Sequence, residues 1–339
     1  MSKVTMQDIA NALSTSRISV WKALNNRPGV SDELRAEIRR KAEEMDYFKA
    51  AEYTPEAEPQ PTRTVAAAVS RPESSLFWMQ IIHQLAKELS RNNVNLLYTY
   101  LPTHSKEDFA LPATLIDGAV SGMIVLNVYD EALLRRLAAL PLAKVFLDTM
   151  PAVPYCQLNG DLVMIEGRDA VRQITEKLLA TGRTRLGFVG DTGYAQTNTD
   201  RYNGFCDALA AHGLAPRPAW NLTGPLGLRT HYEEISRFLD SLPQLPQAFV
   251  CASDYIAHFI CRYCTEHEIP PEKTPVLTGF DNNFEYGNVA GQISTVDVDT
   301  KAIGARLANK ILFAIDHPLA MHETSYTSTQ VLYRGELAE

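Results

Sequence analysis

Five side chains that could contact the edges of nucleic-acid bases lie on one side of a helix expected at residues 16–25. At 100° per residue, two cations, an amide and two large apolar groups fall within about 140° of one another. Guanine acceptors and thymine methyl groups lie side by side in the DNA major groove, so this mixture suits that groove. A merely solvated face would carry mostly charge and small polar groups. The five residues are Arg17, Ile18, Trp21, Lys22 and Asn25.

The helices that position these residues are predicted from caps and turns within residues 5–47. Thr5 is a suitable N-cap for a helix from Met6 to about Leu13, and Ser31 for one that runs to about Asp46. The middle helix has an opposite, apolar side that suits a core, and turn residues flank it. The pattern predicts a helix-turn-helix. A second interpretation of Trp21 is that its indole packs back on the third helix.

A second group of candidate residues follows predicted strands in the rest of the chain. Asp148, Ser253 and Asp281 each stand at the end of an apolar run, and Arg201 opens a predicted helix after the loop 191–200. Carboxylates accept hydrogen bonds from hydroxyl groups and a guanidinium donates to them, so the set suits a polyhydroxylated ligand. A single strand-end Asp is often only a helix cap, so the prediction rests on the group.

Aromatic side chains could complete such a site. Phe77 and Trp78 are expected in the loop after the first strand of the body, where they could contact the apolar face of a sugar. The alternative for Trp78 is packing between lobes or between two copies of the chain.

Short apolar runs alternate with amphipathic helices from Arg63 onward. This alternation is typical of parallel, doubly wound sheets, and roughly 275 residues suit two such lobes better than one. Ligands bind at the carboxyl ends of the strands, which would face a shared cleft. The expected strands are 64–70, 94–100, 122–126, 143–147, 185–189, 247–250, 275–278 and a stretch near 294–296, with helices at about 75–91 and 164–180.

Charge is distributed unevenly along the 339 residues, whose formal net charge is −8. Residues 1–31 contain four Lys or Arg and one acid, so any nucleic-acid site must be local to this region. Residues 51–62 contain three Glu, no base and three Pro. An extended, semi-rigid or disordered linker is expected there.

The five cysteines are odd in number and scattered, so no disulfide framework is expected. His258, Cys261, Cys264 and His267 are spaced by three and could suggest a zinc site. On one helix, however, each step of three turns about 60° backwards, so the four side chains spread over about half the circumference. Small buried thiols on a packed helix are the favoured interpretation, and no metal is expected.

Several classes of protein lack their signatures in this chain. No run approaches the roughly 18 apolar residues of a membrane helix, and residues 1–10 lack the apolar core of a signal peptide. The expected location is the cytoplasm, with no membrane partner. Enzyme motifs are missing too, since Gly187, Gly190 and Gly193 have the wrong spacing for a dinucleotide loop. An enzyme is the first rival hypothesis and an exported solute-binding protein the second. No cofactor is expected.

The N-terminal region resembles the head of the lactose/galactose repressor family. The resemblance rests on residues 4–16, 19–25 and 28–31, and the spacing from Thr5 to Asn25 matches without a gap. It implies that Arg17, Ile18 and Lys22 read bases. Ser14 and Trp21 depart from the family pattern, which leaves the base preference open. The positions that contact phosphates in the family are Thr5, Ser16, Ser19, Asn25 and Ser31.

The segment after Tyr47 departs from that family. Members normally continue with a Pro-Asn-x-x-Ala-Arg-x-Leu hinge, which folds on the operator and wedges a leucine into the minor groove. Residues 48–55 match neither the Pro-Asn pair nor the arginine and leucine, and the following strip is acidic. We expect weaker minor-groove engagement and less DNA bending than in a typical member, with the head coupled to the body through another contact.

The remainder of the chain resembles the periplasmic-binding-protein-like body of the same family. Arg201 matches the family's Arg-x-x-Gly-Phe arginine, which clamps ligand hydroxyls or carboxylates. Asp148 and Asp281 match its strand-end ligand aspartates, and Ser253 stands where many members have asparagine. The ligand set implied is Phe77, Asp148, Arg201, Ser253 and Asp281. A sugar fits these groups, and a nucleobase is the alternative.

The predicted architecture has three parts. An all-α helix-turn-helix head covers residues 1–48, an acidic, Pro-containing linker covers 49–62, and residues 63–339 form a two-lobed, periplasmic-binding-protein-like α/β body that binds the effector and dimerises. The predicted function is a transcriptional regulator, a repressor, whose operator affinity is controlled by a small ligand. The expected partners are a pseudo-palindromic double-stranded DNA operator, a sugar effector and a second copy of the chain, with a tetramer as the alternative to a dimer.

Overall fold

The chain divides into two compact units, Met1–Pro61 and Thr62–Glu339, in a computed structural model. The structure describes residues 4–47, 63–70, 75–106, 108–227 and 230–338. The predicted linker, 49–62, and the atypical hinge, 48–55, lie outside the described residues, so the boundaries drawn around them stay predictions.

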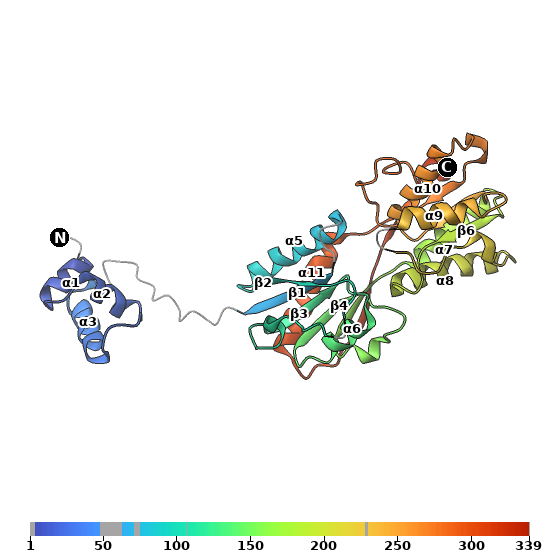
Figure 1. Cartoon of the computed structure of the whole chain (residues 1–339). Coiled ribbons are helices and arrows are strands. Elements are labelled where there is room, and N and C mark those ends of the chain that lie inside the picture. The colour runs from blue at the N-terminus through green and yellow to red at the C-terminus, as the bar shows by residue number, and fades with distance from the viewer. Residues whose placement is uncertain (1–3, 48–62, 71–74, 107, 228–229, 339) are drawn as a thin grey trace. The chain divides into compact units, whose positions relative to one another are not determined.

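The first unit contains the three predicted helices in the predicted order, α1 (Met6–Ala12), α2 (Arg17–Leu24) and α3 (Asp32–Glu44) (Figure 1). Each begins after a hydroxyl side chain that accepts a hydrogen bond from the backbone of the first turn. The sequence therefore predicted these helices to within a residue or two at each end. Their shared core consists of Ile9, Ala10, Val20, Ala23, Leu24, Ile38 and Ala42.

The first lobe of the second unit is built on a six-stranded parallel sheet with the order β10-β5-β4-β3-β1-β2 (Figure 1). Alternate residues of its strands enter different cores on the two faces of the sheet, which explains why the strands read as continuous apolar runs. The elements are β1 (Thr64–Ser70), α5 (Leu76–Arg91), β2 (Asn95–Leu101), β3 (Gly122–Leu126), α6 (Glu131–Ala138), β4 (Ala143–Leu147), β5 (Asp161–Ile165), α11 (Thr300–Asp316) and β10 (Thr324–Thr327).

The second lobe has a parallel sheet with the order β6-β7-β8, and a separate antiparallel pair, β9 and β11, joins it through bridges at Thr278 and Asp281. The elements are α7 (Arg168–Ala180), β6 (Leu186–Val189), α8 (Gln196–Ala211), α9 (His231–Asp240), β7 (Ala248–Cys251), α10 (Asp254–Glu266), β8 (Val276–Thr278), β9 (Thr295–Asp297) and β11 (Gln330–Leu332). Short 3-10 helices in the two lobes are η2 (Ala113–Leu115), η3 (Tyr155–Gln157), η4 (Pro218–Trp220), η5 (Pro271–Lys273) and η6 (Gly335–Leu337).

The chain passes between the lobes at three places within the described residues: between β5 and α7, between β9 and α11, and between β10 and β11. Short crossings of this kind let two lobes change their relative angle without unfolding either sheet. They also place the carboxyl ends of β3 and β4 opposite the elements that follow β7 and β8.

Three local predictions about the body are wrong. The helix expected from residue 164 begins at Arg168, because Met164 and Ile165 belong to β5, a short apolar run that periodicity alone does not separate from a helix. Arg201 lies in the second turn of α8 and does not open it, since α8 begins at Gln196 without a side-chain cap that would mark its start. Phe77 and Trp78 lie in the first turn of α5, within the helix expected at 75–91, and not in the loop before it.

The helix expected around the cysteines is present as α10, in which Cys264 is buried. Its His258 ring is hydrogen-bonded to Asn288 at 2.6 Å. In the part of the chain that the structure describes, no helix is long and apolar enough to cross a membrane.

Candidate functional site

The outward face of α2 carries the residues predicted to read bases. Ile18 is 67% exposed and Trp21 44% exposed, and Arg17 is exposed as well. Val20, Ala23 and Leu24, on the opposite side, are buried in the head core. Since Trp21 is not part of that core, the alternative in which its indole is packed away on α3 is not what the structure shows. Contact of this face with DNA stays a prediction.

The residues predicted to contact phosphates have local hydrogen bonds at helix ends. Thr5 accepts from the backbone N–H of Asp8. It donates its hydroxyl and its own N–H to the Asp8 carboxylate, and these two bonds lower the pKa of Asp8. Ser16 accepts from the N–H of Ser19, and Ser31 from that of Leu34. Asn25 donates to the carbonyl of Trp21. These side chains fix where each helix begins or ends, which orients the α2 face.

Arg35 is a positioning residue that sequence reasoning missed. Its guanidinium, on α3, donates to the carbonyl oxygens of Lys22 at 3.2 Å, Ala23 at 3.3 Å and Arg27 at 2.9 Å. These carbonyls lie at or beyond the end of α2, where the helix has no further backbone N–H groups to donate to them. Arg35 therefore fixes the angle between the two helices. No pattern in the sequence marks it, since the contact spans a turn whose path is known only from the fold.

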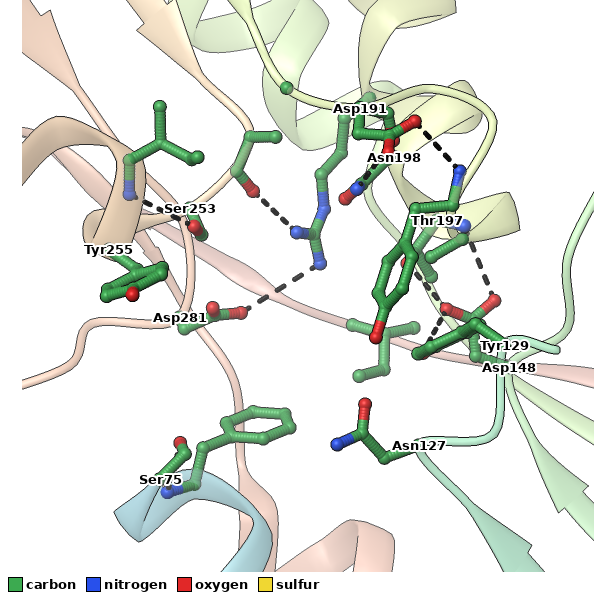
Figure 2. Close-up of a pocket in the computed structure, with 18 of the residues that line it drawn as sticks. Ser75, Asn127, Tyr129, Asp148, Asp191, Thr197, Asn198, Ser253, Tyr255 and Asp281 are labelled. Carbon is green, nitrogen blue, oxygen red and sulfur yellow. Dashed lines mark hydrogen bonds and ion pairs between the residues drawn. The ribbon is translucent and has the colours of Figure 1, made fainter. Parts of the chain in front are cut away.

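All five residues predicted to bind the ligand line one cavity of about 280 Å³ between the two lobes (Figure 2). Phe77 comes from α5 and Asp148 from the end of β4, while Arg201, Ser253 and Asp281 come from the second lobe. The volume is near the lower end for ligand pockets, which run from about 300 Å³ upward. The predicted cluster therefore exists in space, and its role in binding stays a prediction.

Arg201 is buried, only 6% exposed, and is held on three sides. One terminal nitrogen, Nη1, donates to the carbonyl of Ala252 at 2.6 Å, and the guanidinium lies 3.6 Å from the centre of the Phe280 ring. The other, Nη2, is 3.9 Å from a carboxylate oxygen of Asp281. Its Nε has no hydrogen-bond partner among the described residues. A buried donor without a partner is costly, so the position of Arg201 carries one unsatisfied N–H group.

Gly204 explains how α8 brings Arg201 to this place. A Cβ atom at Gly204 would lie 2.0 Å from the carbonyl oxygen of Arg168, so only glycine lets α8 approach α7 this closely. The Arg-x-x-Gly-Phe spacing thus sets both the packing of the helix and the position of its arginine.

Asp281 faces Arg201 across the cavity and accepts no hydrogen bond from the described residues. Burial raises the pKa of its carboxyl, and the Arg201 charge partly offsets that. Its backbone has φ of +96°, a conformation that an L residue adopts only where the surroundings hold it. Here a hydrogen bond from its own N–H to the carbonyl of Val296 provides that hold. Asp281 is therefore fixed in place with its carboxylate available.

Asp148 differs from Asp281, because the protein itself occupies both of its oxygens. Oδ1 accepts from the N–H of Thr149 at 2.8 Å and of Thr197 at 3.3 Å. Oδ2 accepts from the hydroxyl of Tyr129 at 2.9 Å and of Thr197 at 2.7 Å. Thr197 is in α8 of the second lobe and Tyr129 in the first, so the carboxylate joins the lobes behind the cavity (Figure 2).

Replacing Thr197 with valine tests this inter-lobe hydrogen bond. The change removes one buried bond to a carboxylate at nearly constant volume, so we expect the free energy of unfolding of the body to fall by about 1–3 kcal/mol. Denaturant unfolding followed by circular dichroism measures it. Thr184→Val, at an exposed threonine, is the matched control; equal losses in both variants would contradict the structural role of the Asp148–Thr197 bond.

Asp254 is a second buried carboxylate beside the cavity, and it predicts a pH dependence. Burial and the nearby Asp281 charge raise its pKa to about 7, although it accepts hydrogen bonds from Thr295 and from the N–H of Asn283. Its folded pKa exceeds the unfolded value, so the folded protein holds the extra proton. The stabilisation is complete below about pH 4 and is lost as the pH rises towards 7, at up to about 1.4 kcal/mol per unit.

We expect Asp254→Asn to remove this slope between pH 4 and 7, measured as the free energy of unfolding at several pH values. Asp108→Asn, at an exposed carboxylate, is the control and should leave the slope unchanged. Parallel pH profiles for wild type and Asp254→Asn would refute the raised pKa.

Several lining residues were missed by the sequence prediction. Asn127 follows β3 directly, so the same strand-end rule that found Asp148 could have found it. Asp191 follows β6 by two residues, as Ser253 follows β7, so the rule could have found it too. The others lie on loops and helix starts that carry no such signal. They include Tyr129, Tyr194, Thr197, Asn198 and Tyr286.

Known proteins share this arrangement. Residues 175–335 match a periplasmic binding protein-like domain. The HTH-type transcriptional repressor PurR of Mannheimia succiniciproducens is 23% identical over 97% of both chains, and the sucrose operon repressor of Klebsiella pneumoniae 23% identical over 89% of both. Among solved structures, a CelR–cellobiose complex has a TM-score of 0.70 at 19% identity, covering 98% of this chain and 99% of that one. A lac repressor dimer bound to operator has a TM-score of 0.67 at 16% identity over 98% of both chains.

The fold and the two sites define a two-lobed ligand-binding body joined in one chain to a helix-turn-helix head. Together with the full-length relatives, they show that the chain is similar to transcriptional regulators of the lactose/galactose repressor family.

Proposed function

We propose that this protein is a transcriptional repressor whose affinity for a DNA operator is controlled by a sugar bound between the lobes of its body. One observation carries the proposal: the chain combines an exposed, mixed cationic and apolar α2 face with a pocket in which the buried Arg201 faces the carboxylate of Asp281, which accepts no hydrogen bond from the described residues. Each feature suits a ligand of a different kind.

The head is proposed to bind the major groove. Arg17, Ile18 and Lys22 would contact base edges. The proposed phosphate contacts are Thr5, Ser16, Ser19, Asn25 and Ser31. Two copies of the chain would present two heads to the half-sites of a pseudo-palindromic operator. One relative of known structure is a dimer on its operator, which supports the dimer. We place the head at residues 1–48, the linker at 49–62 and the effector-binding body at 63–339.

The effector is proposed to act on the angle between the lobes. A ligand held by Arg201 and Ser253 of the second lobe and by Phe77 of the first would favour one closure angle over others. Coupling must be reciprocal, so an effector that weakens operator binding is itself bound more weakly by the operator complex. The relatives' printed names, which include sucrose and ribose operon repressors, support a sugar as the effector.

Selection of binding sites from random-sequence DNA by the full-length protein tests the DNA half of the proposal. We expect an enriched sequence with two-fold symmetry and an affinity at least about a thousandfold above that for unrelated DNA. Titrating the enriched duplex in the presence of sugars then tests whether a sugar changes the affinity of the protein for its operator. Enrichment of no sequence at low salt would overturn the proposal, as would catalytic turnover of a bound sugar by the body.

A further inference from the structure

The charged groups around the cavity are mostly acidic. The lining contains three carboxylates, Asp148, Asp191 and Asp281, and a single strong cation, Arg201. No lysine is among the lining residues that the structure describes. His231 is the one other basic side chain in the lining that the structure describes, so carboxylates outnumber basic groups there. A pocket of this kind opposes the entry of an anion.

Two of these carboxylates serve the protein. Asp148 accepts four hydrogen bonds from protein donors, as described above. Asp191 accepts from the N–H groups of Gly193, Tyr194 and Leu226, which shape the loop before α8. Asp281 accepts none from the described residues, so it is the carboxylate left for a ligand.

The neutral groups that face the cavity add more acceptors. Asn127 donates its Nδ2 to the carbonyl of Ser70, and Asn198 donates its Nδ2 to the carbonyl of Asp191. Each amide oxygen is thereby left without a donor in the described structure, and Figure 2 shows the Asn127 amide turned into the cavity. The tyrosine hydroxyls both donate and accept, so they do not change the excess of hydrogen-bond acceptors over donors in the lining.

Donors are fewer. Arg201 offers Nη2, which lies 3.9 Å from Asp281, because its Nη1 is used by Ala252 and its Nε is buried. Ser253 accepts from the N–H of Ile256 and Ser75 from that of Phe77, which leaves both hydroxyl protons to donate. A phosphate or carboxylate needs several converging donors, and one bound at Arg201 would lie against the Asp281 carboxylate. The complementary ligand brings many donors of its own and no negative charge.

The geometry points to an uncharged polyhydroxylated effector of about monosaccharide size, and we propose that phosphorylated sugars, sugar acids and nucleobases are excluded. This inference rests on the proposed function, because it concerns the same pocket. The cavity volume, about 280 Å³, suits one ring more than two. Aromatic rings such as Phe77 and Tyr194 line it and can cover the apolar face of that ring. A nucleobase, with at most a few N–H donors, leaves most of the acceptors unsatisfied.

Matched probes that differ only in charge test the inference on the full-length protein. Thermal shift would screen neutral pentoses and hexoses, each against its phosphate and its uronic acid, with hypoxanthine and cellobiose as further arms. Calorimetry would then give the dissociation constants. We expect a neutral monosaccharide to bind at least about a hundredfold more tightly than its anionic counterparts. Tighter binding of a phosphate, a uronic acid, the nucleobase or the disaccharide would overturn the inference.

Asp281→Asn supplies a second test with a distinct outcome. Losing the charged acceptor should weaken binding of the neutral sugar at least about tenfold. It should also reduce the ratio between the dissociation constants of the sugar phosphate and of that neutral sugar. Asp108→Asn, a surface change of the same chemistry, should alter neither value. An unchanged ratio of these dissociation constants in Asp281→Asn would contradict the role of Asp281 as the carboxylate that selects a neutral sugar. If no neutral sugar binds while the selected operator still does, the effector class is wrong and the DNA-binding function stands.

Discussion

Replacing Arg201 with alanine is expected to weaken effector binding by at least about a hundredfold while the effector-free protein still binds its operator. A hydrogen bond from a buried charged donor contributes about 1.5–3 kcal/mol, and the Nη2 of Arg201 faces Asp281 at the cavity. The variant also leaves Asp281 without its nearest cation, so the negative charge of the site increases. Calorimetry measures the loss, and fluorescence anisotropy of labelled operator measures the retained DNA affinity.

Two further variants separate binding from folding in that experiment. Arg217, whose guanidinium stacks 4.7 Å from the Trp220 ring outside the cavity, provides the matched control as Arg217→Ala. Arg201→Lys keeps a charge but loses the planar fork, so effector affinity should be only partly restored. Wild-type effector affinity in Arg201→Ala would contradict a role of Arg201 in effector binding. If the effector-free Arg201→Ala variant binds the operator as poorly as an unfolded sample does, Arg201 is needed for folding and not for effector binding alone.

The strand-end rule found residues of this pocket because parallel sheets bring the carboxyl ends of their strands to one edge. Asp148, Ser253 and Asp281 could therefore be placed near one another without knowing the fold in detail. Their individual roles could not be predicted in the same way. The carboxylate of Asp148 is occupied because Tyr129 and Thr197, far apart in sequence, both reach it. That depends on how the two lobes pack, which residue spacing does not encode.

Prediction of the elements followed the strength of their local signals. The head helices were found because Thr5, Ser16 and Ser31 cap them and turn residues separate them. The start of α8 was missed because its first turn, beginning at Gln196, has no side-chain cap. β5 was missed, and its last two residues were included in a predicted helix, because a five-residue run that ends two residues before α7 fits either structure. Tertiary packing decides such cases.

Replacing Arg17 with alanine is expected to lower the free energy of specific operator binding by about 1–3 kcal/mol per half-site. Arg17 is exposed at the first turn of α2, beside Ile18, whose side chain is 67% exposed. No hydrogen bond or ion pair holds it within the described head, so its guanidinium is available to the two acceptors on a guanine edge. Competition between the selected operator and single-base variants, by anisotropy at fixed salt, measures the effect and the position at which discrimination is lost.

The salt dependence distinguishes base reading by Arg17 from a phosphate contact. If Arg17 reads a base, Arg17→Ala relaxes discrimination at one position in each half-site and leaves the slope of log K against log salt nearly unchanged. If it contacts a phosphate, affinity falls uniformly across sequences and the slope decreases by about one per site. Arg40→Ala, at an exposed arginine of α3, is the matched control and should preserve discrimination at every position. A uniform loss in Arg17→Ala would therefore transfer Arg17 from the base-reading set to the phosphate-contacting set. Ile18 and Lys22 would then be the remaining candidates for base recognition.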